Sequence, residues 1–135
     1  MCKSDPSYLS RINLTADKDL LINKIKKSKT DTLPMPGIND DLKKRSEVQN
    51  LLGIYSNLSS QSIDKVKEEF QGKNFSIFKN KLSELLVDKI NPIGKRIKDL
   101  LKDENYLDKI LAKGSQKANN LAMKKINEIK TLVGF

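Results

Sequence analysis

Apolar residues recur at helical spacing along most of this chain, and no stretch shows the alternation of apolar and polar residues that a half-buried strand requires. The pattern therefore predicts an all-α fold, a helical bundle whose helices pack on one another within one chain. Gly, Pro and turn residues interrupt the pattern too often for a long coiled coil. The stripes are formed by Val48, Leu51, Leu52, Tyr55 and Leu58, by Ile63, Val66 and Phe70, by Phe78, Leu82, Leu85, Leu86 and Ile90, and by Ile93, Ile97, Leu100 and Leu101.

Capping residues predict where several helices begin and end. Thr15 is a suitable N-cap for a helix that runs to about Lys29, with acidic residues in its first turn and lysines at its end, as the helix dipole favours. A short helix over residues 62–70 is followed by Gly72, in the position of a C-terminal cap. Asp103 can cap the last helix.

Two residues inside the stripes need a separate interpretation. Gly53 lies within a helical stripe, and we expect it to permit close helix packing. Pro92 either kinks the helix that contains it or starts a new one. The inner face of the last helix is predicted to consist of Leu107, Leu111, Gly114, Ala118, Leu121, Ile126 and Ile129.

The 135 residues amount to one domain with a modest core. Residues 1–14 are expected to form a loop, because Asp5-Pro6-Ser7 disfavours helix. Residues 15–135 are expected to form the helical domain. Pro34, Pro36 and Gly37 mark a linker or turn at residues 32–41 within it.

The composition argues against catalysis contained within this chain. There is no His, so the usual general base, metal ligand and activator of Ser or Cys nucleophiles are missing. One Cys cannot build a disulfide framework or a zinc cage, and we expect no metal site. No apolar stretch approaches the roughly 20 residues that span a bilayer, and no signal-peptide core is evident. We therefore expect a soluble, intracellular protein without membrane contact.

A net charge of +9 and a pI of about 9.6 favour a polyanionic partner such as nucleic acid. The basic runs Lys43-Lys44-Arg45 and Lys95-Arg96 are the candidates for contact with RNA. Each run is equally compatible with a solvated surface, and an A+T-rich genome enriches Lys without selection for binding.

The first residues, M-C-K-S, resemble the K-M-S-K-S signature loop of class I aminoacyl-tRNA synthetases, with its leading Lys lying upstream of Met1. Met1, Lys3 and Ser4 keep their places, and Cys2 replaces the central Ser, which exchanges a hydroxyl for a weaker hydrogen-bond donor. The resemblance implies that residues 1–4 contact ATP and that Lys3 stabilises the charge on departing pyrophosphate during catalysis.

The rest of the chain is similar, segment by segment, to the C-terminal part of bacterial-type and mitochondrial-type tryptophanyl-tRNA synthetases. The related tyrosyl enzymes follow the same loop with a different helical domain and an extra RNA-binding module, so tryptophan is the preferred substrate. The similar segments are S-R-I-N-L at 10–14, K-T-D-T-L-P at 29–34, N-L-L-G-I-Y at 50–55, F-S-I-F-K at 75–79, I-N-P-I at 90–93, N-Y-L at 105–107, K-G-S-Q-K-A at 113–118 and V-G-F at 133–135.

The resemblance implies that the parent protein activates tryptophan with ATP and Mg²⁺ and transfers it to tRNA(Trp), as a homodimer. It also implies that the helical domain contacts the anticodon end of the tRNA, beside a Rossmann-like catalytic fold that this chain lacks. The chain alone is then expected to be inactive. A bacterial cytoplasm is the preferred location, ahead of the mitochondrial matrix.

Two alternatives stand beside this interpretation. One is a free-standing basic helical adaptor that binds RNA without catalysis. The other is a helical protein-interaction module with no nucleotide contact. The coding sequence upstream of Met1 would separate them, because only the synthetase requires an in-frame nucleotide-binding fold there.

Overall fold

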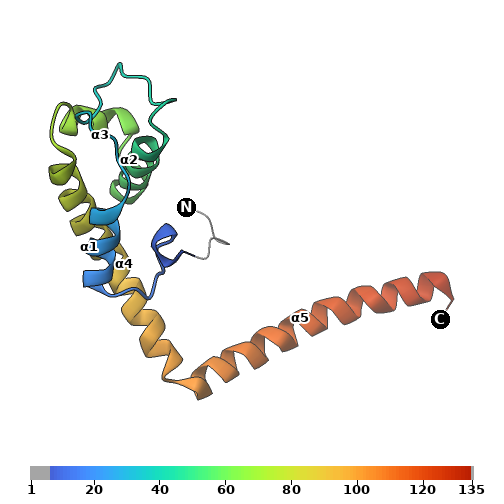
Figure 1. The fold of residues 1–135 in the computed structure, drawn as a ribbon. Helices are drawn as coiled ribbons and strands as arrows, with labels where there is room; N and C mark the ends of the chain where they lie inside the picture. The colour runs from blue at the N-terminus through green and yellow to red at the C-terminus, as the bar shows by residue number, and fades with distance from the viewer. Residues whose placement is uncertain (1–6, 135) are drawn as a thin grey trace. The chain divides into compact units, whose positions relative to one another are not determined.

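The computed structural model describes residues 7–134, and within them every regular element is a helix (Figure 1). This confirms the all-α prediction for that part of the chain. A short 3-10 helix is followed by five α-helices: η1 (Tyr8–Ser10), α1 (Lys18–Lys27), α2 (Ser46–Ser59), α3 (Ile63–Phe70), α4 (Phe75–Leu101) and α5 (Glu104–Val133).

The chain divides into two compact units, Met1–Lys95 and Arg96–Phe135. The first unit contains η1, α1, α2, α3 and most of α4, and the second contains the end of α4 and α5. Residues 28–45, between α1 and α2, contain no helix and include the predicted linker. The proposed boundary after residue 14 stays a prediction.

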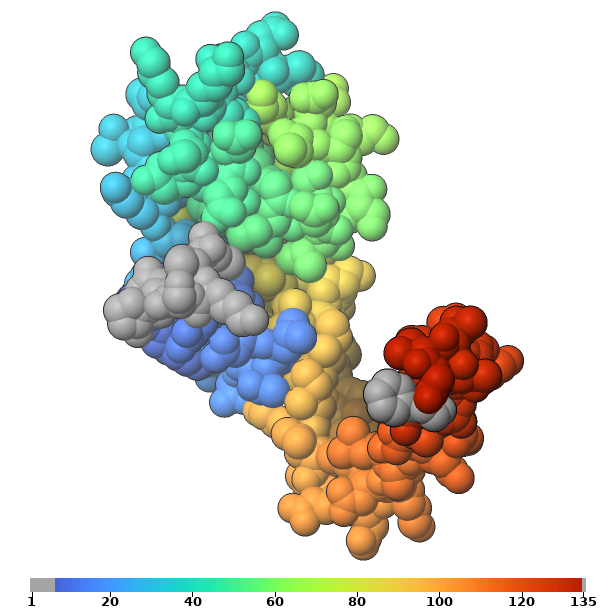
Figure 2. Space-filling model, turned by 90° about the vertical axis from the view of Figure 1, so that its right-hand side faces the viewer, coloured from blue at the N-terminus to red at the C-terminus, as the bar shows by residue number. Residues whose placement is uncertain are grey.

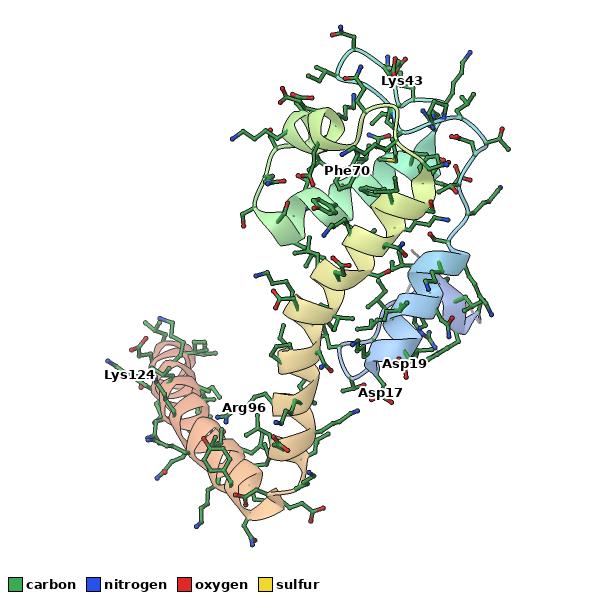
Figure 3. The ribbon with its side chains drawn as sticks, turned by 90° about the vertical axis from the view of Figure 1, so that its left-hand side faces the viewer. Asp17, Asp19, Lys43, Phe70, Arg96 and Lys124 are labelled. Carbon is green, nitrogen blue, oxygen red and sulfur yellow. The ribbon has the colours of Figure 1, made fainter. Side chains whose placement is uncertain are left out.

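The core of the first unit is built around three aromatic rings. Phe70 and Phe78 meet edge to face with centroids 5.0 Å apart, and Tyr55 lies 5.3 Å from Phe70 and 5.6 Å from Phe78. Figure 3 shows Phe70 among the helices of this unit, and Figure 2 shows the teal and green segments of α2 and α3 joined in one continuous surface. The predicted stripe residues Val48, Leu51, Leu52, Val66, Leu82 and Leu86 are buried around these rings.

Three predicted helix ends are confirmed. The Ser62 side chain accepts a hydrogen bond from the Lys65 amide at 3.3 Å, which caps α3. Gly72 has a φ of +72°, the left-handed backbone that glycine adopts most easily after a helix. Asp103 accepts a hydrogen bond from the Tyr106 amide at 3.0 Å and so caps α5.

The predicted start of α1 at Thr15 is wrong. Thr15 lies in a turn closed by a 3.0 Å hydrogen bond from the Ala16 amide to the Asn13 carbonyl, and Asp17 takes the N-cap position instead. Figure 3 shows Asp17 and Asp19 together at this end of α1, where negative charge suits the helix dipole. The helix also ends two residues early, at Lys27.

Pro92 lies inside α4, so the helix does not restart there. The close packing predicted for Gly53 is found instead at Gly94. A Cβ at Gly94 would overlap the backbone carbonyl oxygen of Leu14, whereas a Cβ at Gly53 would meet no atom within 4 Å. The prediction for Gly53 is wrong, and the segment around Leu14 crosses α4 where only a glycine leaves room.

In the second unit, none of the 30 residues of α5 is buried. The prediction that one face of this helix belongs to a core is therefore wrong for this chain. The physical reason is the amount of chain available, since the unit contains little besides α5 and the last turns of α4. Among the exposed apolar residues of the helix are Ile110, Leu111, Leu121, Met123, Ile126 and Ile129.

Candidate functional site

The predicted ATP-loop residues Met1, Cys2, Lys3 and Ser4 lie outside the described residues, so their roles stay predictions. The segment that follows them begins with a compact turn. The Ser7 side chain accepts a hydrogen bond from the Leu9 amide at 3.3 Å, and the Ser10 hydroxyl donates to the Ser7 carbonyl at 2.8 Å.

Lys24 anchors this segment to α1. Its ammonium donates a 2.7 Å hydrogen bond to the Arg11 carbonyl and lies 3.6 Å from the centroid of the Tyr8 ring, a cation-π contact. Only 5% of the residue is exposed. Burial, and secondarily the charge of Arg11, holds the pKa of Lys24 below its usual value. In the sequence, only helical spacing could have indicated that Lys24 is buried, because it lies three residues after Leu21, on the same face of the helix.

Two more lysines bind loop carbonyls in the same way. The Lys67 ammonium donates to the Asp40 carbonyl at 3.0 Å and to the Ile38 carbonyl at 3.2 Å. The Lys79 ammonium donates to the Ser28 carbonyl at 2.7 Å, and burial lowers its pKa. These cations satisfy partly buried backbone carbonyls, so part of the positive charge of the chain supports the fold.

The basic run at residues 43–45 divides into two kinds of residue. Lys43 and Lys44 are exposed, and Figure 3 shows Lys43 on the long loop before α2. Arg45 forms a two-point ion pair with Asp31, at 2.7 Å and 2.8 Å, and also donates to the Pro34 carbonyl at 2.9 Å. The hydrogen bonds from Arg45 are the main cause that holds the pKa of Asp31 below its usual value. Arg45 thus closes the loop between α1 and α2.

The second basic run lies on α4. Lys95 and Arg96 are successive exposed residues, the last of the first unit and the first of the second. Within the second unit, Arg96 lines a shallow hollow of about 200 Å³ together with Asp99, Leu100, Asp103 and Tyr106. These acidic neighbours give the hollow a mixed charge.

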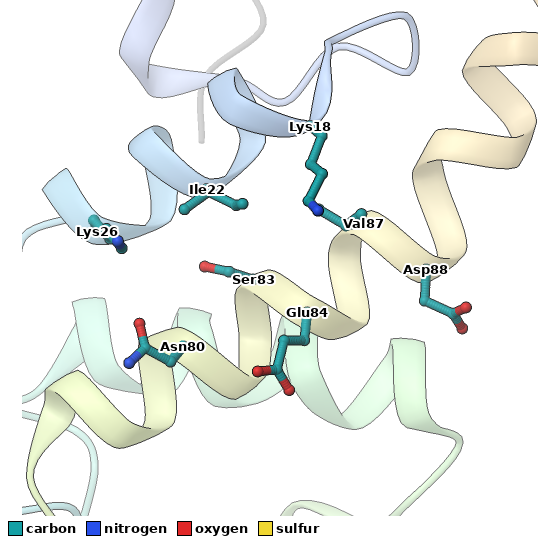
Figure 4. Close-up of a pocket in the computed structure, with 8 residues that line it drawn as sticks. All are labelled: Lys18, Ile22, Lys26, Asn80, Ser83, Glu84, Val87 and Asp88. Atoms are coloured by element: carbon teal, nitrogen blue, oxygen red, sulfur yellow. The ribbon is translucent and has the colours of Figure 1, made fainter.

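A larger groove, of about 500 Å³, lies between α1 and α4 in the first unit (Figure 4). The groove has no local signature in the sequence, because the lining residues of its two walls are more than 50 positions apart in the chain and meet only on folding. Its lining consists of Lys18, Ile22 and Lys26 from α1 and of Asn80, Ser83, Glu84, Val87 and Asp88 from α4.

Within residues 7–134, no group of three or more His, Cys, Asp or Glu side chains is placed to hold a metal ion. No helix in the same range is long and apolar enough to cross a bilayer.

The chain is similar along all of its 135 residues to bacterial tryptophan–tRNA ligases, while no protein-family model matches it. It is 44% identical to the ligases of Caulobacter vibrioides, Agrobacterium fabrum and Rickettsia felis, and covers 39%, 38% and 40% of their respective lengths. The chain thus spans about two fifths of the curated relatives it matches. By this similarity, the 135 residues are homologous to one part of bacterial tryptophan–tRNA ligases.

Proposed function

We propose that this chain is the C-terminal part of a tryptophan–tRNA ligase. The whole protein would activate tryptophan with ATP and transfer it to tRNA(Trp) in protein synthesis. The observation that carries the proposal is the 44% identity over the full 135 residues, shared by relatives that all bear this name. The helical fold is compatible with this proposal. It supplies packed helices and exposed cations, and a C-terminal part of the ligase requires no catalytic pocket of its own.

Residues 1–4 are proposed to contact ATP, with Lys3 at the pyrophosphate. An ammonium that meets the leaving group mainly in the transition state accelerates adenylate formation more than it strengthens ATP binding. Mg²⁺ is proposed to arrive with ATP as part of the substrate. Tyr8 and Arg11, held by Lys24, would then connect the ATP loop to the helical unit.

The helical residues are proposed to contact tRNA(Trp), with Lys43, Lys44, Arg45, Lys95 and Arg96 as candidates. The exposure of the four residues other than Arg45 supports the proposal, because an exposed cation can reach a phosphate without breaking a contact within the fold. Arg45 can take part only with the donors that its Asp31 pair leaves available.

The whole protein is further proposed to act as a homodimer in the bacterial cytoplasm. A free-standing RNA-binding adaptor is not favoured, because the relatives that match the whole chain are ligases more than twice its length.

A chimera tests the proposed function. The 135 residues replace the matching segment of the Caulobacter vibrioides ligase, and tryptophan-dependent exchange of pyrophosphate into ATP is measured. We expect exchange with tryptophan, none with tyrosine, and charging of tRNA(Trp). A second chimera that carries the Agrobacterium fabrum segment controls for the exchange of segments. Activity in this control but not in the first chimera would overturn the proposal.

A further inference from the structure

Lys24 makes two contacts at once with the segment that separates the proposed ATP loop from α1. Its ammonium lies 3.6 Å from the centroid of the Tyr8 ring and donates to the Arg11 carbonyl at 2.7 Å. An apolar side chain at this buried position could pack on the ring but could not donate to the carbonyl. One cation thereby fixes two points of the segment, three residues apart, against the helix.

The remainder of this segment is fixed to the core and to α4. Ile12 is partly buried and packs against the hydrophobic core. The Leu14 carbonyl lies so close to α4 that any Cβ at Gly94 would overlap it. Ala16, at the end of the segment, is buried. Residues 8–16 are therefore held against the helices of the first unit along their whole length.

The proposed pyrophosphate contact lies only a few residues before this fixed segment. Lys3 precedes Tyr8 by five positions, and five residues of extended chain span at most about 18 Å. Any shift of Tyr8 or Arg11 would therefore also move the chain from which Lys3 must reach the pyrophosphate. A misplacement of about 1 Å can remove much of the effect of a catalytic group on the rate.

From these contacts we propose that Lys24 is a positioning residue for adenylate formation. By holding the Tyr8 ring and the Arg11 carbonyl, it determines the position from which the ATP loop presents Lys3 to the departing pyrophosphate. Lys24 acts through Lys3 and touches no reacting atom itself. The inference rests on the proposed function, because it assumes that Lys3 meets the pyrophosphate.

A double-mutant cycle with Lys3 in the active chimera tests this role. Lys24→Met should lower kcat for tryptophan-dependent pyrophosphate exchange about tenfold and change the KM for tryptophan less than twofold. In the Lys3→Ala background, the same substitution should lower kcat less than twofold, because the group that it positions is already absent. Transfer of tryptophan from added tryptophanyl-adenylate to tRNA(Trp) should be unchanged, since that step follows the departure of pyrophosphate.

Further variants separate positioning from a loss of folding. Lys24→Arg keeps a cation that can stack on the ring and donate to the carbonyl, and should restore kcat to within about threefold of the unaltered chimera. Tyr8 is 45% exposed, so Tyr8→Leu removes the ring with little loss of packing. It should lower kcat about threefold, and more than the conservative Tyr8→Phe does. Lys27→Met, an exposed change on the same helix, is the matched control and should change kcat less than twofold.

Two results with an active chimera would overturn the positioning role of Lys24. One is an equal kcat for Lys24→Met and Lys27→Met. The other is an equal fold-loss from Lys24→Met with and without the Lys3 ammonium, which would show that Lys24 supports only the fold. Both results leave the proposed function standing, because the chimera forms the adenylate. An inactive chimera beside an active Agrobacterium fabrum control would instead overturn the proposed function and the role of Lys24 together.

Discussion

The ammonium of Lys24 lies 3.6 Å from the centroid of the Tyr8 ring while it donates to the Arg11 carbonyl at 2.7 Å. Two residues of the segment that directly follows the predicted ATP loop are thereby fixed to α1. A lysine that the helix dipole alone would explain thus has a specific structural partner.

Replacing Lys24 should release this segment. Lys24→Met keeps the aliphatic length of the side chain but removes the ammonium, so the Arg11 carbonyl loses its hydrogen-bond donor. We expect the free energy of unfolding to fall by about 1–2 kcal/mol. Urea denaturation measures this loss, and hydrogen exchange should show weaker protection of residues 9–12. Lys27→Met, an exposed change near the end of the same helix, is the control. Equal effects of the two substitutions would contradict a special role for Lys24.

The pair between Asp31 and Arg45 should make stability depend on acid. The pKa of Asp31 lies below its ordinary value of 3.8 in the folded chain, so the unfolded chain takes up the proton first as the pH falls. The stability from the pair is therefore present above pH 3.8 and lost as the pH drops through the folded pKa. Asp31→Asn should remove this component, as seen in urea midpoints between pH 2 and 6.

Asp88→Asn is the matched control for that measurement. Among residues 7–134, its carboxylate forms an ion pair only with the adjacent Lys89, at 3.4 Å and in an exposed position. An exposed pair of this kind contributes little to stability. If both variants kept the acid dependence of the unaltered chain, the pair of Asp31 would not be its source.

Single replacements in the basic run at 43–45 should affect either stability or RNA binding, depending on the residue. Arg45→Ala removes the loop clamp, and we expect it to lower the free energy of unfolding by on the order of 1 kcal/mol. Lys43→Ala and Lys44→Ala should leave stability unchanged but weaken binding of the anticodon stem-loop and flatten its salt dependence. An unchanged salt slope in both lysine variants would place the RNA contact elsewhere.

Two glycines within helices should respond to alanine in opposite directions. Gly94→Ala places a Cβ against the Leu14 carbonyl, a backbone atom that cannot easily move, and should destabilise the chain by about 1–3 kcal/mol. Gly53→Ala meets no atom and should stabilise α2 by about 0.5–1 kcal/mol through the better helix propensity of alanine. Thermal melting of both variants checks the signs, and a stable Gly94→Ala variant would refute the close approach.

Sequence alone predicted what depends on neighbours along the chain. The start of α3 near residue 62 and the turn at Gly72 follow from local backbone chemistry, and the core positions of Leu52 and Tyr55 follow from helical spacing. Asp17 and not Thr15 is the N-cap, because residues 13–16 form a turn and the helix can begin only after it. Residue propensities alone do not decide between these two starts.

Features that depend on tertiary approach could not be predicted. Gly53 and Gly94 are equivalent as helical glycines, and only the path of the Leu14 backbone distinguishes them. In the sequence Arg45 is one residue of a basic run, and only the folded chain shows that it pairs with Asp31. The α1–α4 groove likewise has no signature in either helix, since Lys26 and Asn80 become neighbours only when the helices pack.

The chemistry proposed for the first residues is tested at Lys3 in the active chimera. If its ammonium meets the departing pyrophosphate mainly in the transition state, Lys3→Ala should lower the rate of adenylate formation by on the order of 10²-fold or more. The KM for tryptophan should change little, because the lost interaction is not one of uniform substrate binding. Pyrophosphate exchange at varied tryptophan measures both quantities, with Lys65→Ala as the control for loss of one charge. An exchange rate close to that of Lys65→Ala would show that Lys3 is only a solvated lysine.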